Sequence, residues 1–449
     1  MIFSPVRKYS HHRLRQHNFP QKFSGAGNSL KSVAAGVRER VYIMKKIIGF
    51  SLLALLIIVV IAFLPLTREL VAVGDIWRET GVKPEIGIKG GHVYLLNLGF
   101  HYARSSEKRI TALPESVGQL RELETLDLSG NKLTSLPECV WNLKKLKILD
   151  IGYANEMGQK EFKIYRNGFT SLPDGVGNLT NLRSLRIGGN KIGSIPPGVF
   201  RLGNLETIVA GDCGLTELPE EVGNLTNLQF LILAKNGLTA LPESVKNLKK
   251  LKWLDISNNK FETMPDCIGE LKNMQWLDLR DNKLSALPDS MRDMKKLGFL
   301  SVAGNRFTSV HDCVWGMTDL WHFGFNRNMI TSLPDKFDSF PRLFNFYVGE
   351  NKLDSVPPSV WELKELEHAL LNGNKLTSLP ENIGDAKAMK SLFLQKNMLT
   401  SLPESIGNMK DLEVLDISDN KLTALPESIS GITNLKALRL EGNDIKDKN

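Results

Sequence analysis

Aromatic residues recur every 23 positions in the middle of the chain. Phe230, Trp253, Trp276 and Phe299 follow one another at this spacing, and His322 continues the series. Aligned rings offer an apolar surface for recognition. The alternative is a purely structural role, in which each ring packs against its neighbours along the sheet. With residues at equivalent positions of other units, they form the predicted ligand-binding set: Phe230, Trp253, Trp276, Phe299, His322, Asp255, Asp278, Tyr347, His368, Leu370 and Phe393.

No motif of catalytic chemistry accompanies these residues. The sequence lacks the GxxxxGK(S/T), HExxH, GxSxG and CxxC patterns of phosphate-binding, zinc-dependent, serine-dependent and redox or metal sites. His322 and His368 are two units apart, which is too far for both to ligate one metal. Asp255 and Asp278, with Arg280 nearby, are interpreted as solvated polar surface. We therefore expect a protein that is not an enzyme and has no cofactor or metal.

A repeated unit positions the aromatic series. The unit reads LxxLxLxxNxLxxLPxxIxxLxx, and its asparagine recurs at intervals of 23 or a multiple of 23 from Asn167 to Asn443, with Cys213 in the one slot that lacks it. A Leu-Pro-like pair follows each slot, and only Val310-His311 lacks the proline. Such a fixed period is the sequence signature of a stacked repeat protein.

The units resemble the typical leucine-rich repeat of the LPxxIGxLxxL kind. Similar units occur in Ras-suppressor-like, plant intracellular Ras-group and many bacterial leucine-rich-repeat proteins, and the resemblance covers about residues 110–449. It implies an α/β repeat solenoid, a horseshoe with a concave parallel β-sheet, built from about 14 repeats of 23 residues. Alternate strand residues point outward, so the aromatic series is expected on the concave face, about 4.8 Å apart.

An apolar segment precedes the repeats. Residues 47–66 contain no charge, and twenty helical residues span roughly 30 Å, the thickness of a bilayer core. Lys45 and Lys46 come directly before it, which predicts a cytoplasmic N-terminus with the repeats periplasmic or extracellular. The alternative is a signal peptide cleaved after Ala72-Val73-Gly74.

The predicted organisation has four parts. They are a basic disordered tail (1–43), a transmembrane signal-anchor segment (44–67), an N-terminal cap with a first irregular repeat (68–108) and the leucine-rich-repeat domain (109–449). The first 46 residues hold ten of the 57 Lys and Arg residues, and the rest of the chain has a net charge of −1. The high pI therefore does not indicate nucleic-acid binding. Translation that begins at Met44 would explain the tail, because residues 1–43 would then not be part of the protein. An organelle presequence is the alternative explanation.

Two insertions and a cap complete the sequence-based picture. Seven extra residues between Leu98 and Ile110 and thirteen between Ile151 and Phe169 should leave the solenoid at the same rim. The insertions are expected to form a second contact site through five residues: His101, Tyr102, Tyr153, Phe162 and Tyr165. The alternative is that both insertions are mobile and neutral. Residues 68–80 are expected to form an amphipathic cap helix anchored by Trp77.

The sequence thus favours a membrane-anchored protein that binds a protein ligand on its concave face. A carbohydrate or envelope-polymer binder is the first alternative, because aligned tryptophans also suit sugars. A cytoplasm-facing scaffold with reversed topology is the second.

Overall fold

The computed structural model describes residues 52–100, 108–155 and 164–445, with the backbone alone for 52–64 and 155. The chain divides into two compact units, 1–67 and 68–449. The predicted disordered tail (1–43) and residues 44–51 of the predicted transmembrane signal-anchor segment (44–67) lie outside the described residues. Helix α2 spans Leu52–Thr80. Among the described residues, no helix combines the length and the apolar character needed to cross a bilayer.

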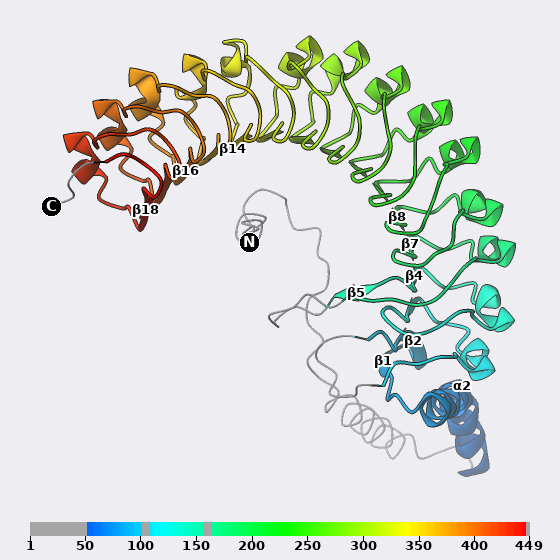
Figure 1. Cartoon of the computed structure of the whole chain (residues 1–449). Coiled ribbons are helices and arrows are strands. Elements are labelled where there is room, and N and C mark those ends of the chain that lie inside the picture. Colours follow the sequence, from blue (N-terminus) through cyan, green and yellow to red (C-terminus); the bar gives the residue numbers. More distant parts are fainter. Residues whose placement is uncertain (1–51, 101–107, 156–163, 446–449) are drawn as a thin grey trace. The chain divides into compact units, whose positions relative to one another are not determined.

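A single curved sheet lines the inner side of the compact unit that contains the repeats (Figure 1). It has 16 strands in the order β1-β2-β3-β4-β7 to β18, and only β1 and β2 pair antiparallel. The predicted repeat solenoid with a parallel sheet is therefore confirmed. The strands are β1 (Glu85–Lys89), β2 (His92–Asn97), β3 (Thr125–Asp127), β4 (Ile148–Asp150), β7 (Ser184–Arg186), β8 (Thr207–Val209), β9 (Phe230–Ile232), β10 (Trp253–Asp255), β11 (Trp276–Asp278), β12 (Phe299–Ser301), β13 (His322–Gly324), β14 (Asn345–Tyr347), β15 (His368–Leu370), β16 (Ser391–Phe393), β17 (Val414–Asp416) and β18 (Ala437–Arg439).

Short 3-10 helices form the outer side of the arc (Figure 1). Most follow directly after the proline of a Leu-Pro pair, whose fixed φ turns the chain away from the sheet. Within the described residues they are η1 (Glu115–Gln119), η2 (Glu138–Asn142), η3 (Asp174–Asn178), η4 (Pro197–Arg201), η5 (Glu220–Asn224), η6 (Glu243–Asn247), η7 (Asp266–Glu270), η8 (Asp289–Asp293), η9 (Asp312–Gly316), η10 (Phe337–Ser339), η11 (Pro358–Val360), η12 (Glu381–Asp385), η13 (Glu404–Asn408) and η14 (Glu427–Gly431).

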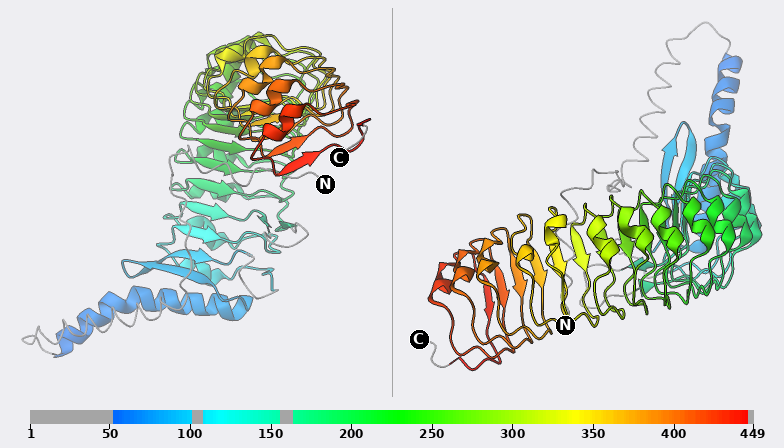
Figure 2. Two further views of the ribbon diagram at one scale, coloured as in Figure 1. Left: turned by 90° about the vertical axis from the view of Figure 1, so that its left-hand side faces the viewer. Right: turned by 90° about the horizontal axis from the view of Figure 1, so that it is seen from above.

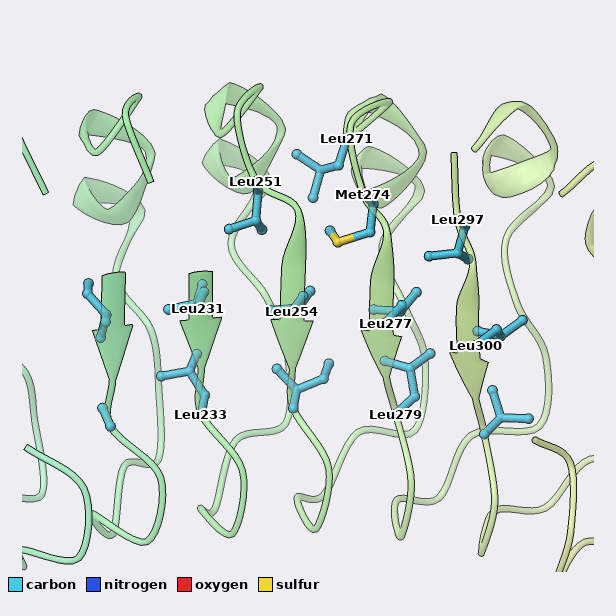
Figure 3. Close-up of a cluster of buried hydrophobic side chains, with 14 of the residues drawn as sticks. Leu231, Leu233, Leu251, Leu254, Leu271, Met274, Leu277, Leu279, Leu297 and Leu300 are labelled. Atoms are coloured by element: carbon cyan, nitrogen blue, oxygen red, sulfur yellow. The ribbon is translucent and has the colours of Figure 1, made fainter. Parts of the chain in front are cut away.

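Leucines fill the space between the sheet and the 3-10 helices (Figure 3). Leu254, Leu277 and Leu300 come from successive strands and are fully buried. The repeated asparagine closes each turn: Asn282 Nδ2 donates to the carbonyls of Ile256 and Leu279, each at 3.0 Å. One unit cannot bury its leucines alone, so its stability comes from its neighbours.

The N-terminal end of the solenoid is covered by the second part of α2 and by the β1–β2 hairpin (Figure 2). Ala72 and Ile76 of the helix are fully buried, as expected for a cap. Trp77 is 49% exposed, so its predicted role as the anchor is wrong. It follows Ile76 directly, and one helical step of about 100° turns it away from the buried face. Glu69 fastens the helix instead, because its carboxylate accepts from Val93 N at 2.6 Å.

The second insertion forms a small hairpin of its own. Strands β5 (Ala154–Asn155) and β6 (Ile164–Tyr165) pair antiparallel and make a separate two-stranded sheet. The sequence indicated an insertion here but not its secondary structure.

Candidate functional site

Four rings stack on the concave face, and we call Trp253, Trp276, Phe299 and His322 the aromatic ladder. Their strands pair in parallel register, which brings the rings opposite one another. The ring centroids of neighbouring members are 4.1, 3.5 and 4.2 Å apart, and the ring planes lie within 9° of parallel. The predicted line of stacked rings is confirmed for these four residues.

Phe230 does not belong to the ladder. It stands opposite Trp253 in the register of β9 and β10, but the two rings do not pair. The face of Trp253 that points toward β9 is therefore not covered by any ring among the described residues. At the other end, the Tyr347 ring meets His322 edge-on at 4.9 Å. The half-buried Leu370 and Phe393 continue the apolar surface from there.

Trp321 is the residue of this site that sequence reasoning missed. It directly precedes β13, and its tilted ring lies 5.8 Å from Trp276 and 5.6 Å from Phe299. It is 37% exposed, whereas Phe299 beneath it is 8% exposed. A Cβ at Gly298, the equivalent position one repeat earlier, would collide with the Trp321 indole. That glycine was a signal in the sequence, because polar residues such as Gln275 and Lys252 hold this position in the preceding units.

The position directly before each strand otherwise carries a row of polar contacts, which we call the polar row. Charged or amide partners from adjacent repeats pair along it: Lys147–Glu124 (2.8 Å), Arg183–Glu206 (3.0 Å), Lys252–Gln229 (2.9 Å), Lys390–Glu367 (2.5 Å) and Lys436–Glu413 (2.8 Å). The row is interrupted at Gly298, Trp321 and Phe344. The interruption lies beside the ladder, so the apolar surface is widest there.

The two carboxylates beside the ladder differ from each other. Asp278 is 2% exposed and accepts from Arg280 through both carboxylate oxygens, with Nε at 2.8 and 2.9 Å. The prediction of solvated polar surface is therefore wrong for Asp278, which is buried under the arginine two residues further on. Asp255 accepts from Ser257 N at 3.0 Å and from Ser257 Oγ at 2.7 Å. Burial, and then the negative charge of Asp278, raise the pKa of Asp255.

The two histidines of the site are neutral at physiological pH. Burial, and then the positive charge of Arg280, lower the pKa of His322 to about 3. Burial, followed by Lys390, lowers the pKa of His368 to about 4. Within the described residues, no group of three His, Cys, Asp or Glu side chains is placed to hold a metal ion.

At the rim, residues that flank the first insertion contact a residue that flanks the second. Tyr165 of β6 packs on Phe100 at 4.5 Å, and the Arg109 guanidinium lies 5.3 Å from the Tyr165 ring. The predicted common rim is thus seen for the flanks of both insertions. His101, Tyr102 and Phe162 lie outside the described residues.

Tyr153 reaches from the rim toward the ladder. Its ring lies over Gly188, where a Cβ would come within 2.9 Å of it. Burial and then the charge of Asp255 raise the pKa of the Tyr153 hydroxyl. The Tyr153 hydroxyl is therefore close enough to the Trp253 end of the ladder to respond to the charge of Asp255.

Family models match several parts of the repeat region. The model described as leucine rich repeat matches residues 226–284 and 387–445. The two-copy leucine-rich-repeat model matches 121–157, and a single-repeat model matches 181–202. No curated protein matches the sequence. Leucine-rich repeats usually serve as non-catalytic interaction modules, and nothing in these matches points to catalysis.

Solved structures with the same architecture come from bacteria and plants. A leucine-rich-repeat protein of Leptospira interrogans is 31% identical, with a TM-score of 0.67 over 78% of this chain and 90% of that one. The functional domain of InlJ from Listeria monocytogenes is 22% identical, with a TM-score of 0.63 over 77% and 67% of the two chains, which is evidence for the fold alone. The Arabidopsis receptor kinase HAESA, in complex with the peptide hormone IDA and the co-receptor SERK1, is 26% identical, with a TM-score of 0.53 over 74% and 64%.

The period, the parallel sheet, the asparagine contacts and the Leptospira relative agree. The chain belongs to the leucine-rich-repeat family.

Proposed function

We propose that this chain is a membrane-anchored, non-catalytic binding protein that holds a peptide or protein on its concave face. The observation that carries the proposal is the position of Trp321, partly exposed over Gly298 at the interruption of the polar row. Exposed aromatic side chains within a polar surround are typical of recognition surfaces. HAESA, which shares the fold, is complexed with a peptide hormone. The LPxxIGxLxxL spacing supports a place near the Ras-suppressor-like group within the family.

The stacking within the ladder favours a protein ligand over a sugar. Sugars pack their C–H groups on the flat faces of aromatic rings, and each face shared by Trp253, Trp276 and Phe299 is covered by the neighbouring ring. Ring edges remain for contact, together with the tilted Trp321 and the one face of Trp253 that no ring among the described residues covers. Apolar side chains of a peptide fit such an edge-lined surface better than a pyranose does. A carbohydrate ligand remains the alternative that the test must separate.

We propose that residues 47–66 anchor the protein, with the N-terminus cytoplasmic and the repeats periplasmic or extracellular. The twenty uncharged residues after Lys45 and Lys46 support this orientation. Protease treatment of intact cells or spheroplasts tests it: digestion of the repeats from outside is expected. Protection of the repeats would instead indicate the reversed topology of a cytoplasm-facing scaffold.

Site-specific crosslinking in cells tests the binding function. A photoreactive residue at Gln275, an exposed member of the polar row beside Gly298, should capture a discrete protein or peptide. The same probe at Glu221, exposed on η5 of the outer side, is the matched control. The Gln275 product should disappear when Trp253→Ala and Trp276→Ala are combined in a protein that stays folded.

Two results would contradict the proposal. One is an equal pattern of products from the Gln275 and Glu221 probes, since the concave face would then have no preference. The other is unchanged capture by the folded double variant, which would leave the ladder with a purely structural role. Selective retention on a glycan array would favour the carbohydrate alternative.

A further inference from the structure

We infer that the concave face recognises an extended basic peptide, with a Lys or Arg side chain between Trp253 and Asp255 and a large apolar side chain about four residues away against Trp321. This inference rests on the proposed binding function and specifies the chemistry of its ligand.

The first argument is an unbalanced carboxylate. Three aspartates at the second outward position of their strands have an arginine partner: Asp150 has Arg186 at 3.8 Å, Asp278 has Arg280, and Asp416 has Arg439 at 3.1 Å. Asp255 occupies the same position on β10, and among the described residues it forms no salt bridge. Among the described residues its printed hydrogen bonds come from Ser257 alone and engage one carboxylate oxygen, while Arg280, which is bound to Asp278, acts on Asp255 through its charge without a salt bridge to it. A cation from outside the chain would complete the pattern.

The second argument is the ring beside that carboxylate. Trp253 and Asp255 are two residues apart on one strand, so their side chains leave the same face of the sheet. Trp276 covers one face of the Trp253 indole, and no ring among the described residues covers the other. An indole face is the preferred aromatic partner of an ammonium or guanidinium group. The ring and the carboxylate together therefore favour a Lys or Arg side chain.

The third argument is the partly covered apolar surface at Gly298. The missing side chain there makes room for the Trp321 ring, which packs across Trp276, Phe299 and His322 and remains 37% exposed. No polar-row partner stands over this part of the ladder. A large apolar ligand side chain would pack against Trp321 here without desolvating a charge.

The spacing of the two sites sets the spacing of the ligand residues. β10 and β13 are three steps apart in the sheet, which is about 14 Å at the usual separation of strands. An extended peptide rises about 3.3 Å per residue and covers that distance in about four residues. β10 to β13 are each paired on both sides, so the peptide would cross them and be read by side-chain contacts rather than by added strand pairing.

Peptide selection followed by charge exchange tests the inference. The full-length chain, kept in detergent micelles, is used to select from a phage library of random linear dodecapeptides. We expect enriched peptides to carry Lys or Arg three to five positions from a large apolar residue. Asp255→Asn should weaken the binding of a synthetic enriched peptide at least about tenfold. Asp255→Lys combined with a Lys→Glu or Arg→Glu exchange in the peptide should restore it.

Asp127→Asn is the matched control. Asp127 accepts from Ser129 N and Oγ at 2.9 and 2.7 Å, as Asp255 does from Ser257, but its strand carries Thr125 in place of a tryptophan. Enriched peptides without a basic residue, or equal affinity of the Asp255→Asn variant and the wild type, would overturn the inference while leaving peptide binding intact. Enrichment of no peptide, or binding that survives Trp253→Ala with Trp276→Ala, would overturn the proposed function and the inference with it.

Discussion

The indole of Trp321 lies in the space that a side chain at residue 298 would occupy. A Cβ built on Gly298 would overlap the Nε1 and Cδ1 atoms of Trp321. The two residues hold equivalent positions in successive repeats, so the glycine of one unit permits the exposed aromatic residue of the next. This pairing, and not the stacked rings alone, distinguishes the central repeats from the rest of the solenoid.

Gly298→Gln is the first prediction. Gln275 holds the same position one repeat earlier, so the backbone accepts this side chain, and the Trp321 ring is expected to move off the ladder. Capture of the ligand should fall about tenfold or more, with a change in unfolding free energy below about 1 kcal/mol. Binding assays and urea unfolding measure the two effects. Trp77→Ala, which removes an exposed tryptophan of α2, is the control that should leave binding unchanged.

A second prediction concerns Asp255 and pH. Its raised pKa means that the folded state binds the proton more tightly than the unfolded state does. The contribution of Asp255 to stability is therefore greatest below its ordinary pKa of about 3.8 and falls as pH rises through the folded-state pKa. Asp278, Arg280 and Tyr153 are the titratable groups that act with it on this face.

Asp255→Asn should raise the melting temperature at pH 7 and leave it unchanged near pH 3. The amide oxygen can still accept from Ser257, so the local turn is retained. Thermal unfolding followed by circular dichroism at the two pH values checks this. A lower melting temperature of the variant at pH 7 would show that the carboxylate stabilises the fold.

His322 gives the third prediction. Because its folded-state pKa is about 3, the folded state binds the proton less tightly than the unfolded state, whose pKa is near 6.5. Its contribution to stability is full above pH 6.5 and is lost as pH falls toward 3, by up to about 1.4 kcal/mol per pH unit. His322→Phe keeps a ring against Phe299 and should make the acid dependence shallower by that amount. Urea unfolding at pH 7, 5.5 and 4.5 measures it; parallel curves for the two proteins would contradict it.

Cys213 provides the fourth prediction. Its Sγ donates to the carbonyls of Ile187 and Gly211 at 3.4 and 3.5 Å, where asparagine in other repeats donates at about 3.0 Å. An amide is the stronger donor and also an acceptor. Cys213→Asn should therefore stabilise the domain by about 1 kcal/mol. Asn282→Cys is the reverse exchange and should destabilise the domain by a similar amount. Equal stability of the wild type and the two variants would show that the hydrogen bonds of the asparagine side chain do not stabilise the fold.

The fifth prediction concerns the N-terminal cap. Glu69 is buried and accepts from Val93 N and from His92 Nδ1 at 3.0 Å. Glu69→Ala leaves a buried N–H without its acceptor and should cost about 2–3 kcal/mol of unfolding free energy. Hydrogen exchange is expected to accelerate first in β1 and β2. Glu79→Ala, an exposed glutamate of the same helix, is the control that should change little.

The inward residues and turns of the fold could be predicted residue by residue. A 23-residue interval leaves only one way to bury Leu254, Leu277 and Leu300 together, and Asn282 can bond two carbonyls only if the repeats stack in register. Trp77 was misassigned because periodicity alone did not distinguish the buried Ile76 from its exposed neighbour. The hairpin of β5 and β6 was not predicted, since two short strands inside an insertion carry no repeat to read.

Strand alternation and a constant period act locally, so the residues alone predicted the repeat, the direction of each side chain from the sheet and the line of rings from Trp253 to His322. How those side chains meet across repeats depends instead on the folded arrangement. It separated Phe230 from the ladder, buried Asp278 under Arg280 and left Asp255 without a salt bridge among the described residues. It also laid Trp321 over Gly298. These outcomes depend on rotamers and on contacts between residues 23 positions apart, which no single unit of the sequence specifies.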